Sequence, residues 1–337
     1  MSEQLRPQSS APVPGLAAIH ALIGRKLREV ELEIEENLSS DFEPIDDAGR
    51  YLASSGGKRL RPALVLLTSG LLGYRGPHDV LLGAVFEFIH TATLVHDDII
   101  DDAPVRRGRP SANRVYGSPF TVLLGDYLYI RSMNMALRAR KLRLIDILAE
   151  ATERMIEGEI LAQHLRGRAE VTPEQHMAIV ERKTAWLFSG CCRAATVLAG
   201  GSPQDEHDLA AYGMALGTAF QLVDDLLDLT SDEATIGKPV CSDLREGRLT
   251  LPLIELMHRG TPEERAGVAR VLDDGAFDRF SFERLLRALN EHGCLARTRR
   301  LAEEHAEKAR RLVRRFPPGP YRELLLELPD TVLSRHR

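Results

Sequence analysis

Residues 81–102 read LLGAVFEFIHTATLVHDDIIDD, a long apolar run that ends in a concentration of acidic residues. Strand-like alternation of apolar and polar residues is nearly absent, so the run is interpreted as a helix. Its end carries Asp97, Asp98 and Asp101 at positions i, i+1 and i+4. Positions i and i+4 of a helix share a face and i+1 lies about 100° away, so the three carboxylates form one acidic edge.

A second stretch, FQLVDDLLDL at residues 220–229, repeats this spacing with Asp224, Asp225 and Asp228. Acidic residues on helices are most often only a solvated face. Here leucine, valine and isoleucine flank both triplets, which favours a lined cavity over a solvated surface. Carboxylates this close repel one another and raise their own pKa values unless cations compensate. Mg²⁺ takes one or two carboxylates and fills its remaining positions with phosphate oxygens, so two facing edges could hold one polyanion through several ions.

Basic residues in loops follow glycine- or proline-marked breaks in the helical pattern. Each could be only a solvent-exposed charge. Their positions beside the acidic triplets favour phosphate clamps instead. The residues in question are Lys58, Arg59 and Arg61 in SGGKRLRP, Arg106 and Arg107 in VRRG, and Lys238 in IGKP.

The remainder of the chain also shows helical spacing of its apolar residues, and we predict an all-helical protein of ten or so helices. Helix starts are predicted at Thr172-Pro173 and Ser202-Pro203, where a capping residue precedes proline. Glycines inside helical patterns are expected where helices pack closely. These glycines are Gly158, Gly190, Gly213 and Gly217.

Composition limits the possible partners and compartments. The 337 residues include 44% hydrophobic residues and carry a net charge of -5, which gives no general attraction to nucleic acid or anionic membranes.

Residues 1–15 lack the apolar core of a signal peptide and are predicted to be a disordered tail, with 16–337 forming a single all-helical domain. The longest apolar stretch, Pro62 to Gly73, is shorter than the roughly 20 residues of a membrane span, so a cytoplasmic protein without a transmembrane segment is expected. The four cysteines show no disulfide or metal pattern and are expected to be buried or inert thiols.

Successive motifs along nearly the whole chain resemble those of one enzyme family. They are SGGKRLRP, EFIHTATLVHDDIIDDAPVRRG, LLGDYLY, EGE, KTA, GTAFQLVDDLLD and GKPVCSDLREGRLTLP, in this order. The set is similar to the signatures of the trans-polyprenyl diphosphate synthases, and within them to the long-chain, octaprenyl-type enzymes. This resemblance implies an isoprenoid synthase-type bundle of antiparallel helices around a deep central cavity, with the aspartate motifs facing each other across its mouth.

The resemblance also implies the reaction and its residues. Isopentenyl diphosphate would condense with farnesyl or geranyl diphosphate by Mg²⁺-assisted ionisation, condensation and proton elimination. Three Mg²⁺ ions would be held by Asp97, Asp101 and Asp224, with Asp98, Asp225 and Asp228 completing the edges. Contacts to the allylic diphosphate or its cation fall to Arg106, Lys183, Thr184, Gln221 and Lys238, and contacts to isopentenyl diphosphate to Lys58, Arg61, His90 and Arg107. The family also implies a homodimer.

A lone histidine within an apolar helix is normally structural. His90 instead shares one helical stripe with Thr93, Asp97 and Asp101, which favours a role at the site. One departure from the family stands out: Arg248 occupies a position where lysine is common, and its role stays open.

Ala92 and Thr93 lie about one turn before the first triplet. In the family, bulky aromatic residues at this layer stop the product early, so small residues here indicate a longer, octaprenyl-like product. A shorter-chain geranylgeranyl diphosphate synthase is the alternative. A terpene cyclase usually lacks the second aspartate motif, and a non-catalytic partner subunit would be expected to have lost a triplet, whereas both triplets are intact.

Overall fold

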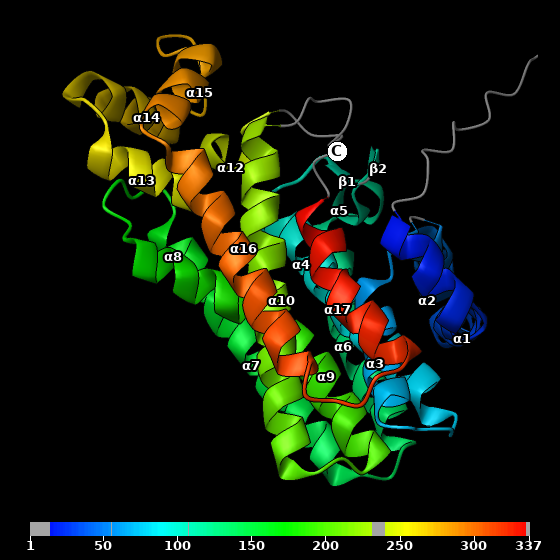
Figure 1. The fold of residues 1–337 in the computed structure, drawn as a ribbon. Helices are drawn as coiled ribbons and strands as arrows, with labels where there is room; N and C mark the ends of the chain where they lie inside the picture. The colour runs from blue at the N-terminus through cyan, green and yellow to red at the C-terminus, as the bar shows by residue number, and fades with distance from the viewer. Residues whose placement is uncertain (1–13, 55, 107, 231–239, 335–337) are drawn as a thin grey trace, which may run out of the picture.

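The computed structural model describes residues 14–54, 56–106, 108–230 and 240–334. Long helices lie side by side, and the shorter α13, α14 and α15 gather at one end of the bundle, at the upper left of Figure 1. The elements are α1 Pro14–Leu38, α2 Glu43–Ala53, α3 Leu60–Leu71, α4 His78–Ile100, β1 Val105–Arg106, β2 Arg109–Pro110, α5 Ala112–Tyr116, α6 Ser118–Leu137, α7 Leu142–Leu165, α8 Pro173–Ile179, the π-helical turn η1 Val180–Ala185, α9 Trp186–Ala199, α10 Pro203–Thr230, α12 Ser242–Arg245, α13 Leu251–Arg259, α14 Pro262–Asp274, α15 Phe282–Glu291, α16 Cys294–Val313 and α17 Pro320–Leu333.

The all-helical prediction is confirmed, since the strands of the described part are the two-residue β1 and β2, which pair as an antiparallel hairpin. The described helices are more numerous than the ten or so expected. Short helices such as α5, with five residues, and α12, with four, account for part of the difference. An element of one turn is too short to display a 3.6-residue period.

Helix α4 forms the centre of the main hydrophobic core. Its side chains at Leu82, Val85, Phe86 and Ile89 are fully buried. Among the described residues α4 has the length and hydropathy of a membrane span, so it exceeds the Pro62–Gly73 stretch that the sequence singled out. Because 72% of its apolar window is buried inside the protein, α4 has the character of a core helix.

Two predicted helix starts are confirmed by their capping geometry. The Thr172 hydroxyl accepts from the Gln175 backbone N–H while the Gln175 side chain accepts from the Thr172 N–H, a capping box that begins α8. Helix α10 begins at Pro203, directly after Ser202. This start places Asp224, Asp225 and Asp228 in the last two turns of a 28-residue helix.

The interior glycines permit close helix packing, as predicted. A Cβ atom at Gly213 would lie 2.5 Å from the Phe188 carbonyl oxygen, and one at Gly158 would lie 2.7 Å from the Lys183 backbone nitrogen. Because Gly158 has no side chain, α7 can pack closely against the π-helical turn that carries Lys183. All four cysteines are free and buried, also as predicted.

The predicted N-terminal tail, residues 1–15, falls almost wholly outside the described residues. That residues 16–337 fold as one domain stays a prediction.

Candidate active site

The C-terminal ends of α4 and α10, which carry the two acidic triplets, lie at the same end of the bundle (Figure 1). The turn η1 contacts both of them. Lys183 Nζ lies 3.6 Å from Asp97 Oδ2 on α4. The next residue, Thr184, donates its hydroxyl to Gln221 Oε1 on α10 at 2.8 Å. π-Helical turns of this kind are frequent at functional sites, because they re-aim side chains within an otherwise regular helix.

Asp97 lies in an electrostatic environment that does not favour its charged form. Burial is the main cause of a pKa raised to about 6; Glu159 and Asp101 raise it further, while Lys183 opposes them. Lys183 also forms an ion pair with Glu159. Burial lowers the pKa of Lys183, but the carboxylates of Asp97 and Glu159 outweigh burial and raise it overall. The ammonium group is therefore held charged between two acids.

Asp101 faces a different cation. Arg248 Nη1 donates to Asp101 Oδ1 at 2.9 Å, and Arg166 Nη1 lies 3.7 Å from the same oxygen. The Arg248 guanidinium also donates to Asp243 Oδ1 at 3.1 Å and pairs with Glu246. Burial lowers the pKa of Arg248, and the surrounding carboxylates outweigh it and raise the pKa above the usual value.

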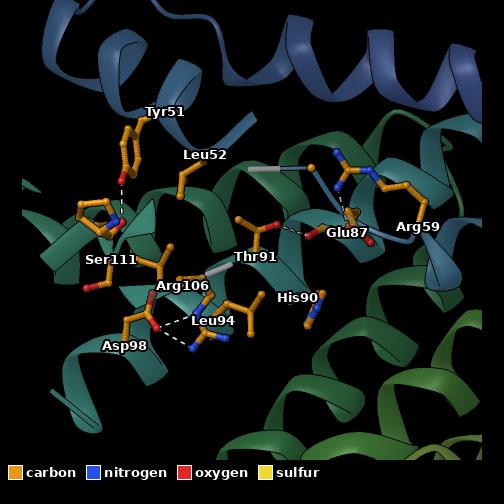
Figure 2. A pocket seen from close by; sticks show the side chains of 14 residues that line it. Tyr51, Leu52, Arg59, Glu87, His90, Thr91, Leu94, Asp98, Arg106 and Ser111 are labelled. Atoms are coloured by element: carbon orange, nitrogen blue, oxygen red, sulfur yellow. Dashed lines mark hydrogen bonds and ion pairs between the residues drawn. The ribbon is translucent and has the colours of Figure 1, made fainter. Parts of the chain in front are cut away.

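Asp98 turns toward the hairpin instead of toward α10. Its side chain is buried, and Arg106 Nε donates to its Oδ1 at 2.7 Å (Figure 2). Asn113 donates to the Asp98 backbone oxygen at 3.2 Å. Asp98, predicted to complete the first acidic edge, and Arg106, predicted to contact the allylic diphosphate, thus bind each other and fix the hairpin to α4.

The aspartates of the second triplet also differ in their exposure and in their partners. Asp224 is exposed, whereas Asp225 is 2% exposed. The buried carboxylate lies 2.9 Å from His176 Nε2 and accepts from Gln221 Nε2 at 3.0 Å.

Asp228 accepts three hydrogen bonds from the start of α12. The donors are the Ser242 backbone N–H at 3.0 Å, the Ser242 hydroxyl at 2.7 Å and the Asp243 backbone N–H at 3.2 Å. Burial, followed by the charge of Asp243, raises the pKa of Asp228 to about 7 even though these bonds favour ionisation.

The predicted isopentenyl diphosphate residues lie around α3 and α4. His90 is half-buried and lines a cavity of about 60 Å³ together with Leu94, Asp98 and Arg106 (Figure 2). Arg61 is half-buried, with its guanidinium carbon 5.1 Å from the centre of the Phe188 ring. Lys58 is exposed. The predicted residues Arg107 and Lys238 lie outside the described residues.

Arg59, considered as a phosphate clamp from the sequence, pairs with two carboxylates in the structure. Its Nε donates to Glu31 at 2.6 Å and its Nη1 donates to Glu87 at 2.7 Å. Glu87 is 5% exposed, so Arg59 neutralises a buried carboxylate. The backbone at Arg59 is left-handed, with a φ of 47°.

Within the described part of the chain, no three His, Cys, Asp or Glu side chains are grouped so that they could hold a metal ion together. Asp97 and Asp101 pair with Lys183 and Arg248 instead. Their chemistry nevertheless suits a hard divalent cation, which prefers carboxylate oxygens. Burial is the main reason that the pKa values of Asp97 and Asp228 are raised, so a bound cation would stabilise the charged form of both carboxylates.

Four residues with close contacts to the predicted site were not singled out from the sequence for this role: Glu159, Arg166, His176 and Arg248. Glu159 lies in the EGE motif, and Arg248 was noted as a departure from the family. His176 and Arg166 carry no local signal, because their contacts are made only by the packing of α8 on α10 and of the α7 end on α4.

Comparison with known proteins identifies the family. The polyprenyl synthetase family model matches residues 43–289. The chain is 39% identical over 322 residues to octaprenyl diphosphate synthase of Escherichia coli (strain K12), covering 96% of this chain and 99% of the relative. A polyprenyl synthase from Caulobacter crescentus CB15, solved in complex with calcium and isoprenyl diphosphate, superposes with a TM-score of 0.91 at 33% identity over 98% of this chain and all of that one. A decaprenyl diphosphate synthase from Rhodobacter capsulatus gives 0.90 at 37% identity, covering 96% and 99%.

The fold and the site thus define an all-α prenyltransferase of the isoprenoid synthase type. The chain belongs to the polyprenyl synthetase family and is a long-chain trans-polyprenyl diphosphate synthase.

Proposed function

We propose that the enzyme extends farnesyl or geranyl diphosphate with isopentenyl diphosphate to an octaprenyl-like all-trans diphosphate. The supporting observation is the position of η1, whose adjacent residues Lys183 and Thr184 contact the first acidic helix and the second. Small residues at Ala92 and Thr93, one turn before Asp97, agree with a long product.

The cofactor in this proposal is Mg²⁺, three ions per site, held by Asp97, Asp101 and Asp224. When bound, the ions neutralise the diphosphate of the allylic substrate, which favours its departure. Lys183, held charged by its acidic neighbours, stabilises the same anion. Binding would require Asp97 and Asp101 to exchange their present cation partners for the metal and its diphosphate.

The bond changes balance without a nucleophilic side chain. The allylic C–O bond breaks and its electron pair leaves with the diphosphate. The alkene of isopentenyl diphosphate then supplies the electron pair for the new C–C bond, and a proton is lost to the released diphosphate. The oxygen atoms of Thr184 and Gln221 lie 2.8 Å apart, and these electron-rich dipoles can stabilise the allylic cation.

Isopentenyl diphosphate is assigned to Lys58, Arg61, His90 and Arg107. Lys58 is exposed, and His90 lines the cavity of Figure 2. Lys238 and Arg106 are assigned to the allylic diphosphate. Arg106 must then share its guanidinium with Asp98, to which its Nε donates at 2.7 Å.

The quaternary state proposed is a cytoplasmic homodimer. Helix α6 exposes Leu123, Ile130 and Leu137 at intervals of seven residues, with 66%, 56% and 49% of each side chain accessible. Ile156 and Ile160 on α7 are 55% and 64% exposed. Apolar side chains repeated at this interval favour helix packing between subunits. Sedimentation velocity should give a dimer that Ile130→Glu converts to monomer; a monomeric parent would refute this part.

The reaction is tested by incubating the purified enzyme with Mg²⁺, isopentenyl diphosphate and farnesyl diphosphate, and sizing the dephosphorylated products. Octaprenol is expected, with no product in the presence of EDTA. Geranylgeraniol as the longest product would favour the shorter-chain alternative, and cyclic hydrocarbons would favour a cyclase.

A further inference from the structure

Four side chains from three elements form one continuous chain of hydrogen bonds beneath the second acidic triplet. His176 on α8 lies 2.9 Å from Asp225 Oδ2 on α10. Asp225 Oδ1 accepts from Gln221 Nε2 at 3.0 Å, and Gln221 Oε1 accepts from the Thr184 hydroxyl at 2.8 Å. His176, Asp225 and Thr184 are 6%, 2% and 8% exposed. Gln221 alone is half-buried, so it is the member of the chain that a ligand can reach.

Asp225 is held in place by these contacts. A carboxylate that is 2% exposed requires hydrogen-bond donors, because it has lost its water. Its two oxygens each have one, His176 on Oδ2 and Gln221 on Oδ1. The neighbouring Asp224 is exposed, so the two adjacent aspartates are directed to different surroundings.

The orientation of the Gln221 amide follows from this arrangement. A carboxylate only accepts hydrogen bonds, so the NH₂ group of Gln221 must face Asp225. The amide oxygen then faces Thr184 and accepts its one hydroxyl hydrogen. Among the described residues Gln221 Oε1 accepts only from Thr184, so its remaining lone pair and those of Thr184 Oγ1 are available as acceptors. Such acceptors suit a developing positive charge and disfavour an anion.

We propose that His176 is a positioning residue, which acts through Asp225 to keep the Gln221 oxygen, and not its NH₂ group, directed to the reacting carbon. This inference rests on the proposed function, because it assumes an allylic cation beside Gln221. Without the His176 contact, Asp225 loses a donor and gains the freedom to rotate, and the amide of Gln221 can turn its NH₂ group toward the cation. The ionisation step then slows, while binding of isopentenyl diphosphate at Lys58 and His90 is unaffected.

The test is a double-mutant cycle on kcat, with product formation from farnesyl diphosphate and isopentenyl diphosphate as the assay. His176→Phe removes the donor at similar volume. His176→Gln retains an N–H near the position of Nε2, and His176→Asn is polar but too short to reach Asp225. Each is made in the parent and in Gln221→Ala, and His305→Phe on α16 is the matched control for loss of a partly buried histidine elsewhere. Circular dichroism melting confirms that each variant is folded at the assay temperature.

We expect His176→Phe and His176→Asn to lower kcat by about tenfold or more in the parent, as displacement of a positioning contact commonly does, with KM for isopentenyl diphosphate within about twofold. In the Gln221→Ala background the same changes should cost less than about twofold, because their target is gone. His176→Gln should recover most of the loss, and His305→Phe should leave kcat unaltered.

Equal losses of kcat in both backgrounds would overturn the proposal, as would parent-like rates in His176→Asn. If His176→Phe fails to fold, the His176→Asn and His176→Gln pair decides the same question. A parent enzyme that makes no prenyl product would instead refute the proposed function, so the two failures are distinguishable.

Discussion

Arg248 and Asp101 are 147 residues apart in sequence, and their side chains meet with Arg248 Nη1 donating to Asp101 Oδ1 at 2.9 Å. The same guanidinium donates to Asp243 at 3.1 Å. The Asp243 backbone N–H in turn donates to Asp228 at 3.2 Å. Arg248 therefore joins the end of the first acidic helix to the residue that supports the second, and its positive charge offsets the repulsion between their carboxylates.

The first prediction concerns this contact. Arg248→Lys retains the charge but loses the planar fork that contacts several carboxylates at once. The free energy of unfolding of the EDTA-treated protein should therefore fall by about 1 kcal/mol, a typical value for a lost charge-assisted bond. Activity should stay within about threefold of the parent, which corresponds to at most about 0.6 kcal/mol of activation free energy.

Urea unfolding monitored by circular dichroism measures the change, and Arg311→Lys on the exposed part of α16 is the control for an arginine-to-lysine change. An Arg248→Lys variant as stable as the parent would show that the bridge contributes nothing to the metal-free state.

The second prediction concerns pH. The pKa of Asp97 is raised to about 6 and that of Asp228 to about 7, against about 3.9 in an unfolded chain. Folding therefore takes up protons in this interval. The unfavourable contribution of these carboxylates is fully present only well above both folded-state pKa values and is relieved as the pH falls through them. The melting temperature of the metal-free enzyme should rise from pH 8 to pH 5.5.

Asp97→Asn combined with Asp228→Asn should flatten this part of the profile, since neither amide titrates. Added Mg²⁺ should raise the melting temperature more at pH 8 than at pH 5.5, because protons and metal compete for the same oxygens. A difference between parent and double variant that is independent of pH would contradict the assignment.

The third prediction separates catalytic aspartates from structural ones. Asp224 is exposed, so Asp224→Ala should leave the melting temperature within a few degrees while turnover falls by about 100-fold or more, through loss of charge stabilisation of the leaving diphosphate. Asp97→Ala should also lose far more turnover than stability. Asp102→Ala is the matched control, since Asp102 is exposed and pairs with Arg114. Near-normal rates in Asp224→Ala would remove it from the metal site.

The fourth prediction concerns Arg59. Arg59→Met leaves the buried Glu87 without its cation and should destabilise the fold by about 3 kcal/mol, the scale for breaking a buried ion pair. Adding Glu87→Gln should recover part of that loss. KM for isopentenyl diphosphate should stay near the parent value for the folded enzyme, whereas Lys58→Met should raise it. If Arg59→Met raises KM as much as Lys58→Met without loss of stability, Arg59 is a clamp after all.

Local sequence signals account for much of the architecture. The two apolar helices that end in aspartates, the capped starts at Thr172 and Ser202, and the glycines at close helix contacts all depend on neighbours within a few residues. Such features follow from backbone geometry and can be predicted from composition and spacing. The roles expected of individual residues came from the resemblance to the family.

The different partners of the aspartates within each triplet could not be predicted in the same way. Asp97 and Asp98 are adjacent, yet one lies near Lys183 and the other binds Arg106, because a one-residue step rotates a side chain by about 100° and packing decides which face each meets. The same holds for Asp224 and Asp225. Arg248 and His176 act across long sequence separations, and only the packed structure brings them to the site.

The last prediction concerns product length. Thr93 precedes Asp97 by four residues, so both lie on one face of α4, and a larger side chain at 93 should obstruct the growing chain one turn below the diphosphate. Thr93→Phe should shift the products from octaprenyl toward farnesyl or geranylgeranyl diphosphate while the first condensation proceeds. Thr91→Phe is the comparison variant, because Thr91 lines the cavity that also contains His90 and Leu94 (Figure 2); it should raise KM for isopentenyl diphosphate and leave the length distribution unaltered. Chromatography of the dephosphorylated alcohols measures both. An octaprenyl product from Thr93→Phe would place the growing chain on another face of the helix.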